Sequence, residues 1–280
     1  RKVLERAHFM RILVCGDVVG RAGRRVLTDN VGKLRENYGI NFVVVNGENA
    51  AGGFGITPKI SNELLDSGAD VITTGNHVWD QRDIIPHFQR EPRLLRPDNF
   101  PKGTPGKGVG DYADTRGRKV VILHLMGRLF MDPLGDPFAC VENMLNTWRL
   151  GRNADAIILD FHGEATSEKM AMGHFVDGRV SAVLGTHTHV PTADAQIFPG
   201  GTGYMSDIGM CGDYNSVIGI KKETSIERFV RKMPTARLEA AQGNATMCAV
   251  LVDTDDITGL ATNIEPIIIG PRLKEQLPRQ

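Results

Sequence analysis

The sequence has few cysteines, and they lack the spacing of a zinc site or a redox pair. Cys15, Cys140, Cys211 and Cys248 include no CxxC pair, and none has a histidine at zinc-finger spacing. A structural zinc site with thiolate ligands is therefore not expected. The pattern is typical of a reduced protein, and we expect a cytoplasmic location.

Long apolar runs are also missing. No segment approaches the ~20 consecutive apolar residues of a membrane-spanning helix, so no membrane partner is expected. Residues 1–9 carry three basic residues but no apolar stretch of the kind that signal peptides have. Met10 opens a strong strand pattern. We therefore expect residues 1–9 to be an upstream extension and residues 10–280 to form a single domain.

The sequence has no excess of charge of either sign. Lys+Arg and Asp+Glu both number 33, so the formal net charge is zero. This balance argues against a protein that binds long nucleic acid through bulk charge, but a small nucleotide substrate remains compatible with it. The oligomeric state is open, and a homo-oligomer is one expectation.

Short apolar, β-rich runs alternate with helical patterns, which predicts the α/β class. Strands are expected at 11–16, 41–46, 70–74, 119–123, 155–160 and 180–185. Helices are expected at 24–37, after Thr57-Pro58, at 80–89 and from Asp136-Pro137 onward, with a loop at 98–118. Such strands predict a mainly parallel sheet with helices on both faces. Later strands, from Ala195 to Ile269, are expected to be antiparallel.

Five apolar strands end in clusters of polar residues and glycine. These ends read Gly16-Asp17, Asn46-Gly47-Glu48-Asn49, Gly75-Asn76-His77, Asp160-Phe161-His162-Gly163-Glu164 and Gly185-Thr186-His187-Thr188-His189. Ligands of α/β sheets bind at the carboxyl ends of strands, so these side chains are expected to converge. Taken singly, Asp17 is also a plausible helix N-cap, and Asn76 a turn residue. Their joint occurrence favours a metal site.

The types of the candidate ligands restrict the metal. Asp17, Glu48, Asn49, Asn76, His162, His187 and His189 offer carboxylate oxygen, amide oxygen and imidazole nitrogen. This mixture suits Fe, Mn, Zn or Ni better than Ca or Mg, which prefer shells made only of oxygen.

These motifs resemble the calcineurin-like metallophosphoesterase superfamily, whose motifs read GDxH, GDxxD, GNH, H and GHxH. The resemblance is closer to the YmdB-like bacterial phosphodiesterase branch, and it extends over residues 10–270. It implies a layered α/β/β/α sandwich with mixed sheets and outer helices. It also implies phosphodiesterase activity on cyclic nucleotides, 2′,3′- or 3′,5′-cyclic, with iron or manganese as metals and zinc as an alternative.

The sequence departs from the wider superfamily at two places. Asp17-Val18-Val19 stands where DxH is usual, so a histidine ligand is missing, and Glu48 replaces the bridging aspartate. The resemblance to the YmdB-like branch implies that Asn49 supplies an oxygen in place of that histidine.

We therefore expect two metal ions that share Glu48 and a hydroxide that attacks the phosphodiester. One ion would be bound by Asp17, Asn49 and His189, and the other by Asn76, His162 and His187. His77 follows a ligand directly and is expected to be the general acid that protonates the leaving group. Its alternative role is to orient a ligand.

Two other functions fit the same residues. A dimetal hydrolase of amides or thioesters would use the same hydroxide on a carbonyl carbon. A regulatory protein could sense a nucleotide through the metal site with little turnover, although a sensor has no need of a general acid such as His77.

Overall fold

The computed structural model describes residues 9–233 and 236–279. The expected upstream extension thus lies outside the described residues except for Phe9. This residue begins strand β1 and is paired with Asp255.

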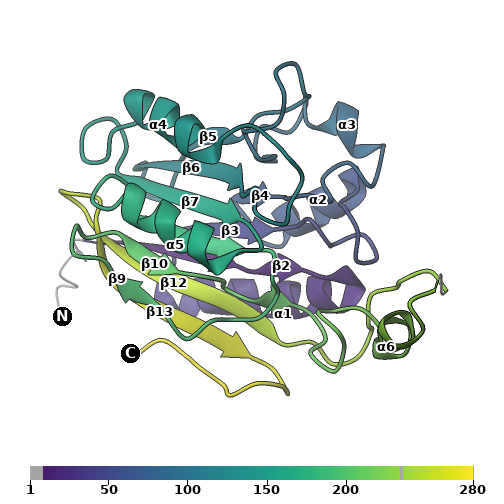
Figure 1. Cartoon of the computed structure of the whole chain (residues 1–280). Helices are drawn as coiled ribbons and strands as arrows, with labels where there is room; N and C mark the ends of the chain where they lie inside the picture. The colour runs from purple at the N-terminus through teal and green to yellow at the C-terminus, as the bar shows by residue number, and fades with distance from the viewer. Residues whose placement is uncertain (1–8, 234–235, 280) are drawn as a thin grey trace.

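Two mixed sheets make up the centre of the molecule (Figure 1). The first has the order β13 (Ala261–Ile269), β12 (Met247–Asp255), β1 (Phe9–Cys15), β3 (Phe42–Asn46) and β4 (Val71–Thr73). The second has the order β5 (Val109–Ala113), β6 (Lys119–Met126), β7 (Ala156–His162), β8 (Ala182–Thr186), β10 (Gly203–Met205) and β9 (Gln196–Ile197). β1, β3 and β4 are mutually parallel, as are β6, β7, β8 and β10.

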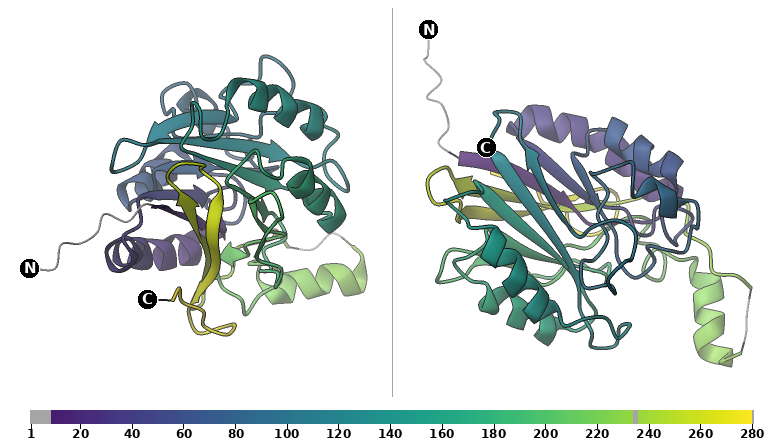
Figure 2. Two further views of the ribbon diagram at one scale, coloured as in Figure 1. Left: turned by 90° about the vertical axis from the view of Figure 1, so that its left-hand side faces the viewer. Right: turned by 90° about the horizontal axis from the view of Figure 1, so that it is seen from above.

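Helices cover the outer faces of both sheets, as the view from above shows (Figure 2). α1 (Gly20–Tyr38) and α2 (Pro58–Asp66) pack on the first sheet, and α4 (Pro137–Thr147) and α5 (Thr166–Phe175) on the second. The short α3 (Ile84–His87) adds Ile84 to the core under α1 and α2, whereas α6 (Lys222–Arg231) lies outside these layers. The predicted α/β/β/α sandwich is confirmed.

The layers follow from side-chain alternation along the strands. In β1, Leu13 and Cys15 face the core that α1 and α2 cover, whereas Ile12 and Val14 face the second sheet. Strands buried on both faces must be apolar throughout, which explains their continuous hydrophobic runs. The core between the sheets fixes how their strand ends meet.

Two predicted helix starts are confirmed in detail. Thr57 accepts a hydrogen bond from the Ile60 amide, 3.3 Å away, with Pro58 at the first helical position. Asp136 caps α4 in the same way, with Pro137 following it. A side-chain oxygen at this position satisfies an amide that has no partner within the helix.

Two helix boundaries differ from the predictions. α1 begins at Gly20, four residues before the predicted start at Arg24, directly behind the strand end at Asp17. The helix predicted at 80–89 is only the four-residue α3, with Pro86 in its single turn. The Asp80 side chain is hydrogen-bonded to the His77 ring, so this segment orients a residue of the candidate site instead of continuing the helix.

Two strand predictions are wrong in part. The predicted loop at 98–118 contains the edge strand β5, whose glycine and exposed side chains hide the alternation. The expectation of antiparallel pairing after Ala195 holds for β9, β12 and β13. It holds only in part for β10, which pairs antiparallel with β9 but parallel with β8. It fails for β11 (Met210–Cys211), which runs parallel to β2 (Asp17–Val18).

Candidate metal centre

The seven predicted ligands gather where the carboxyl ends of parallel strands from both sheets meet. They come from the ends of β1, β3 and β4 in one sheet and of β7 and β8 in the other. Hydrogen bonds tie the two sheets together there, because Thr73 and Asn46 both donate to the buried carboxylate of Asp160, at 2.5 and 3.2 Å. The predicted convergence is thus present.

One set of ligand atoms surrounds Nε2 of His162. This nitrogen lies 3.0 Å from Glu48 Oε1, 3.0 Å from Asn76 Oδ1 and 3.2 Å from His187 Nδ1. Four side chains thus direct potential ligand atoms toward one small volume at the carboxyl ends of the strands.

A second set lies beside the first. His189 Nε2 is 3.1 Å from Asn49 Oδ1 and 3.9 Å from Asp17 Oδ1. Ligand atoms of Asp17, Glu48 and His189 lie within 4.8 Å of one another, as do those of Glu48, His162 and His187. Glu48 therefore belongs to both groups, which is the arrangement that a carboxylate bridging two ions requires.

Hydrogen bonds on the far sides of two histidines fix their proton positions. His189 Nδ1 lies 2.7 Å from the Ile218 carbonyl, which only accepts, so Nδ1 carries the proton. The Thr186 hydroxyl donates to Asp160 Oδ1 at 2.7 Å and is left to accept from His162 Nδ1 at 2.8 Å. Both rings therefore direct Nε2 toward the ligand sets, and this is the nitrogen through which each would bind a metal ion.

One carboxylate oxygen in the site lacks a donor that would satisfy it. Asn49 donates its amide to the Gly53 carbonyl, so its oxygen faces Nε2 of His189. Asp17 Oδ1 is buried without any hydrogen-bond partner among the described residues. An unpaired buried carboxylate oxygen is costly unless a cation lies beside it. The residues present therefore fit divalent metal ions.

The two carboxylates have opposite pKa shifts. Burial raises the pKa of Asp17 to about 6, although positive charge on His189 and His162 acts against this shift. Burial also acts to raise the pKa of Glu48, but the charge and hydrogen bond of His162 outweigh it and lower the value below its usual range. Asp17 thus carries an uncompensated desolvation penalty that a bound cation would relieve.

Backbone features give the ligands the space and the angles that they need. A Cβ on Gly75 would lie 2.2 Å from Glu48 Oε2 and 2.3 Å from His162 Nε2, so only glycine fits there. His187 and His189 both have positive φ angles, 102° and 66°. Such strain in residues other than glycine persists only where surrounding contacts impose it, as at functional sites.

A buried ion pair supports this strained loop. Lys169 Nζ lies 2.8 Å from Asp207 Oδ2, and both side chains are buried. The same carboxylate oxygen accepts the Thr188 amide at 2.9 Å, between the two histidines. Asp207 therefore holds the loop, and Lys169 neutralises its charge.

His77 lies at the edge of the site and belongs to neither ligand group. Its amide donates to Glu48 Oε2 at 3.1 Å, and its Nδ1 lies 2.8 Å from Asp80 Oδ2. The Phe54 ring packs edge-on against it with 5.2 Å between ring centroids. Its side chain is 28% exposed, so the ring is oriented from two sides yet accessible to a ligand.

The sequence predictions missed residues that position the ligands. Asp160 and Thr186 set the proton position of His162, and Glu164 Oε2 lies 3.0 Å from His187 Nε2. Because Glu164 engages Nε2, Nδ1 of His187 faces the site. A signal was present, since Asp160 is a charged residue inside an otherwise apolar strand and such residues are rarely buried without a role.

Known proteins are similar to this chain over most of its length. The model of the YmdB-like protein family matches residues 13–267. A 2′,3′-cyclic-nucleotide 2′-phosphodiesterase from Bacillus subtilis (strain 168) is 47% identical over 261 residues, covering 93% of this chain and 97% of the relative.

Two crystal structures are also similar. A hypothetical protein from Thermus thermophilus has a TM-score of 0.87 at 40% identity, covering 94% of this chain and 100% of that one. A novel phosphatase from Mycoplasma pneumoniae has a TM-score of 0.86 at 33% identity, covering 96% of this chain and 95% of that one.

The facing sheets, the outer helices and the polar strand ends together define a fold of the metallophosphoesterase type. The chain belongs to the YmdB-like protein family. No helix among residues 9–233 and 236–279 is long and apolar enough to cross a membrane.

Proposed function

We propose that this protein is a metal-dependent phosphodiesterase that hydrolyses cyclic nucleotides, with 2′,3′-cyclic nucleotides as the favoured substrates. The observation that carries the proposal is the position of Glu48, which both potential ligand groups share. The relative from B. subtilis, a 2′,3′-cyclic-nucleotide 2′-phosphodiesterase, supports the choice of substrate. Activity on 3′,5′-cyclic nucleotides is the alternative within the same class.

We propose that Asp17, Asn49 and His189 hold one metal ion, that Asn76, His162 and His187 hold another, and that Glu48 contacts both. Nitrogen and oxygen donors without thiolate suit iron or manganese, with zinc as an alternative. When bound, such ions supply Lewis acidity toward the phosphate oxygens and a nucleophile at neutral pH. The unpaired Oδ1 of Asp17 supports this assignment.

His77 is proposed to protonate the leaving oxygen. Its Nδ1 is engaged by Asp80, which leaves Nε2 as the nitrogen that transfers the proton. The amide contact with Glu48 keeps His77 at a fixed distance from the ligand sets. Asp80 and Phe54 orient the ring, so little reorganisation is needed when a substrate binds.

A substrate panel tests this proposal. The protein, loaded with manganese or iron, is assayed with 2′,3′-cyclic nucleotides, 3′,5′-cyclic nucleotides, bis-p-nitrophenyl phosphate and acyl esters. The proposal predicts turnover of the phosphodiesters, fastest with 2′,3′-cyclic nucleotides, and none of the acyl esters. Hydrolysis of acyl esters alone would support the rival dimetal hydrolase. Nucleotide binding without product in a single-turnover experiment would support the regulatory sensor.

Other properties are proposed together with this activity. The four cysteines, all described, form no disulfide, which supports the proposed cytoplasmic location. A single domain spanning residues 10–280 and a homo-oligomeric assembly remain predictions. Size-exclusion chromatography with light scattering checks the assembly.

A further inference from the structure

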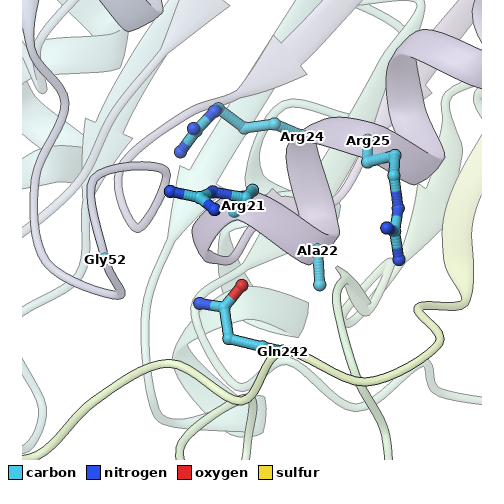
Figure 3. A pocket seen from close by; sticks show the side chains of 6 residues that line it. All are labelled: Arg21, Ala22, Arg24, Arg25, Gly52 and Gln242. Atoms are coloured by element: carbon cyan, nitrogen blue, oxygen red, sulfur yellow. The ribbon is translucent and has the colours of Figure 1, made fainter.

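A second polar pocket lies at the start of α1, apart from the metal ligands. It has a volume of about 560 Å³, within the usual range of small-molecule sites. It is lined by Arg21, Ala22, Arg24, Arg25, Gly52 and Gln242. No acidic side chain is in this lining. Figure 3 shows Arg21 and Arg24 extending on the side of the Gly52 turn, where the Gln242 amide also lies, whereas Arg25 extends from the other side of the helix.

These arginines occupy positions that are unfavourable for the helix itself. Arg21, Arg24 and Arg25 are spaced three and four residues apart, so their like charges are neighbours on the helix surface. They also lie near the N-terminus, where the helix dipole is positive, and the first turn contains no acidic residue. Three positive charges in this place weaken the helix, so the fold alone does not explain them.

Little in the protein neutralises this charge. Arg24 donates to the Ala50 carbonyl at 2.7 Å and to Glu63 at 3.1 Å. Arg21 and Arg25 are exposed and form no ion pair with any residue in the described ranges. The pocket therefore has a net positive lining, in which the Arg21 guanidinium lies on the side of the Gly52 turn and is free to bind a ligand.

The pocket is connected to the metal centre by short hydrogen-bonded links. The Gly20 amide donates to the Asn49 carbonyl at 2.9 Å, which joins the start of α1 to a predicted ligand. Asn49 and Gly53 exchange two hydrogen bonds, each 3.0 Å, across the turn that contains Gly52. Along the chain, Gly52 is three residues from Asn49, at most ~11 Å between Cα atoms.

We propose that this arginine pocket binds the phosphate groups of a second, nucleotide-sized ligand or of the substrate chain beyond the scissile phosphate. The planar guanidinium presents paired donors that match phosphate oxygens. A volume of about 560 Å³ is larger than one phosphate requires and accommodates a nucleotide. The inference does not depend on the proposed activity, because its first test measures binding alone.

The test titrates inorganic pyrophosphate into the metal-loaded protein by calorimetry. The wild-type chain should show two binding events, one at the metal centre and one at the arginine pocket. The variant Arg21→Gln/Arg25→Gln should lose the second event, with at least tenfold weaker affinity, and keep its metal content. Arg21→Lys/Arg25→Lys, which preserves the charge, should retain most of the affinity.

A matched variant controls for net charge. Arg90→Gln/Arg152→Gln removes the same charge from two other exposed arginines, and it should leave both binding events intact. A single event in the wild type, an unchanged isotherm in Arg21→Gln/Arg25→Gln, or an equal loss in the control would overturn the proposal. Thermal melts verify that all variants are folded.

Substrate length then distinguishes the two sources of phosphate. This arm uses the proposed activity and compares a 2′,3′-cyclic mononucleotide with a trinucleotide that has the same cyclic end. If Arg21→Gln/Arg25→Gln raises KM at least fivefold for the trinucleotide but not for the mononucleotide, the pocket binds the substrate chain. Unchanged KM values together with weaker pyrophosphate binding assign it to a separate nucleotide.

Discussion

Replacing Gly75 with alanine should disable the metal centre without disturbing the rest of the fold. The new Cβ would lie 2.2 Å from Glu48 Oε2 and 2.3 Å from His162 Nε2, whereas ordinary contacts start near 3.4 Å. Both side chains must therefore move by about 1 Å. A displacement of this size at a catalytic site costs about 100-fold in rate. We expect Gly75→Ala to lose bound metal and at least that much kcat/KM.

Gly32→Ala provides the matched control for this substitution. Gly32 lies in α1, and a Cβ there would meet nothing within 4 Å. Alanine is the better helix former, so this variant should be more stable by about 0.5–1 kcal/mol, with unchanged metal content and activity. Elemental analysis, thermal melts and the phosphodiesterase assay give the three readouts. A Gly75→Ala protein with two metal ions and activity within twofold of wild type would refute the reasoning.

Four further changes test other parts of the structure. His77→Ala should retain metal and lose about 10²–10⁴-fold in kcat, and loss of metal instead would contradict its role as general acid. Asp80→Asn should lower kcat less than His77→Ala does, because it removes only the negative charge of the group that orients the ring. The Asp160 carboxylate accepts hydrogen bonds from Asn46, Thr73 and Thr186, and Asp160→Asn would place an amide donor against these donors. It should cost about 1–3 kcal/mol in urea unfolding and weaken metal binding about 10–100-fold, and unchanged values would argue against its positioning role. Ile158→Ala opens a cavity between the sheets and should cost about 2–5 kcal/mol with little effect on metal content.

The strands and the site were the most predictable parts of the molecule. Apolar runs such as Phe42–Asn46 are fully buried, and burial on both faces leaves a strong signal in sequence. The polar residues that end these runs were predictable for the same reason, since a polar group stands out at the limit of an apolar strand. All seven ligand candidates lie together because parallel strands bring their carboxyl ends to one edge.

The missed elements have weak local signals. β5 is an edge strand whose pairing with β6 gives it stability, and its Gly110 and exposed Asp111 do not alternate in hydrophobicity. The parallel pairing of β10 with β8 depends on contacts between distant residues, which local patterns do not contain. Propensity is a weak guide wherever tertiary contacts decide the structure.

The missed positioning residues have a different explanation. Asp160 acts through Thr186, which is 26 residues away in sequence, and Glu164 contacts His187 across two segments. The spacing of residues along the chain does not reveal such contacts. Only the three-dimensional arrangement distinguishes Glu164, which contacts the candidate ligand His187, from Glu168, whose carboxylate accepts hydrogen bonds from the amides of Arg128 and Leu129.

The most direct test of a two-metal phosphodiesterase is a metal titration of the chelator-treated protein. Manganese or iron is added stepwise while hydrolysis of a 2′,3′-cyclic nucleotide is followed. We predict no activity in the metal-free protein and a rise to a plateau at two ions per chain. Full activity without metal, or a plateau with no bound metal at the strand ends, would contradict the account.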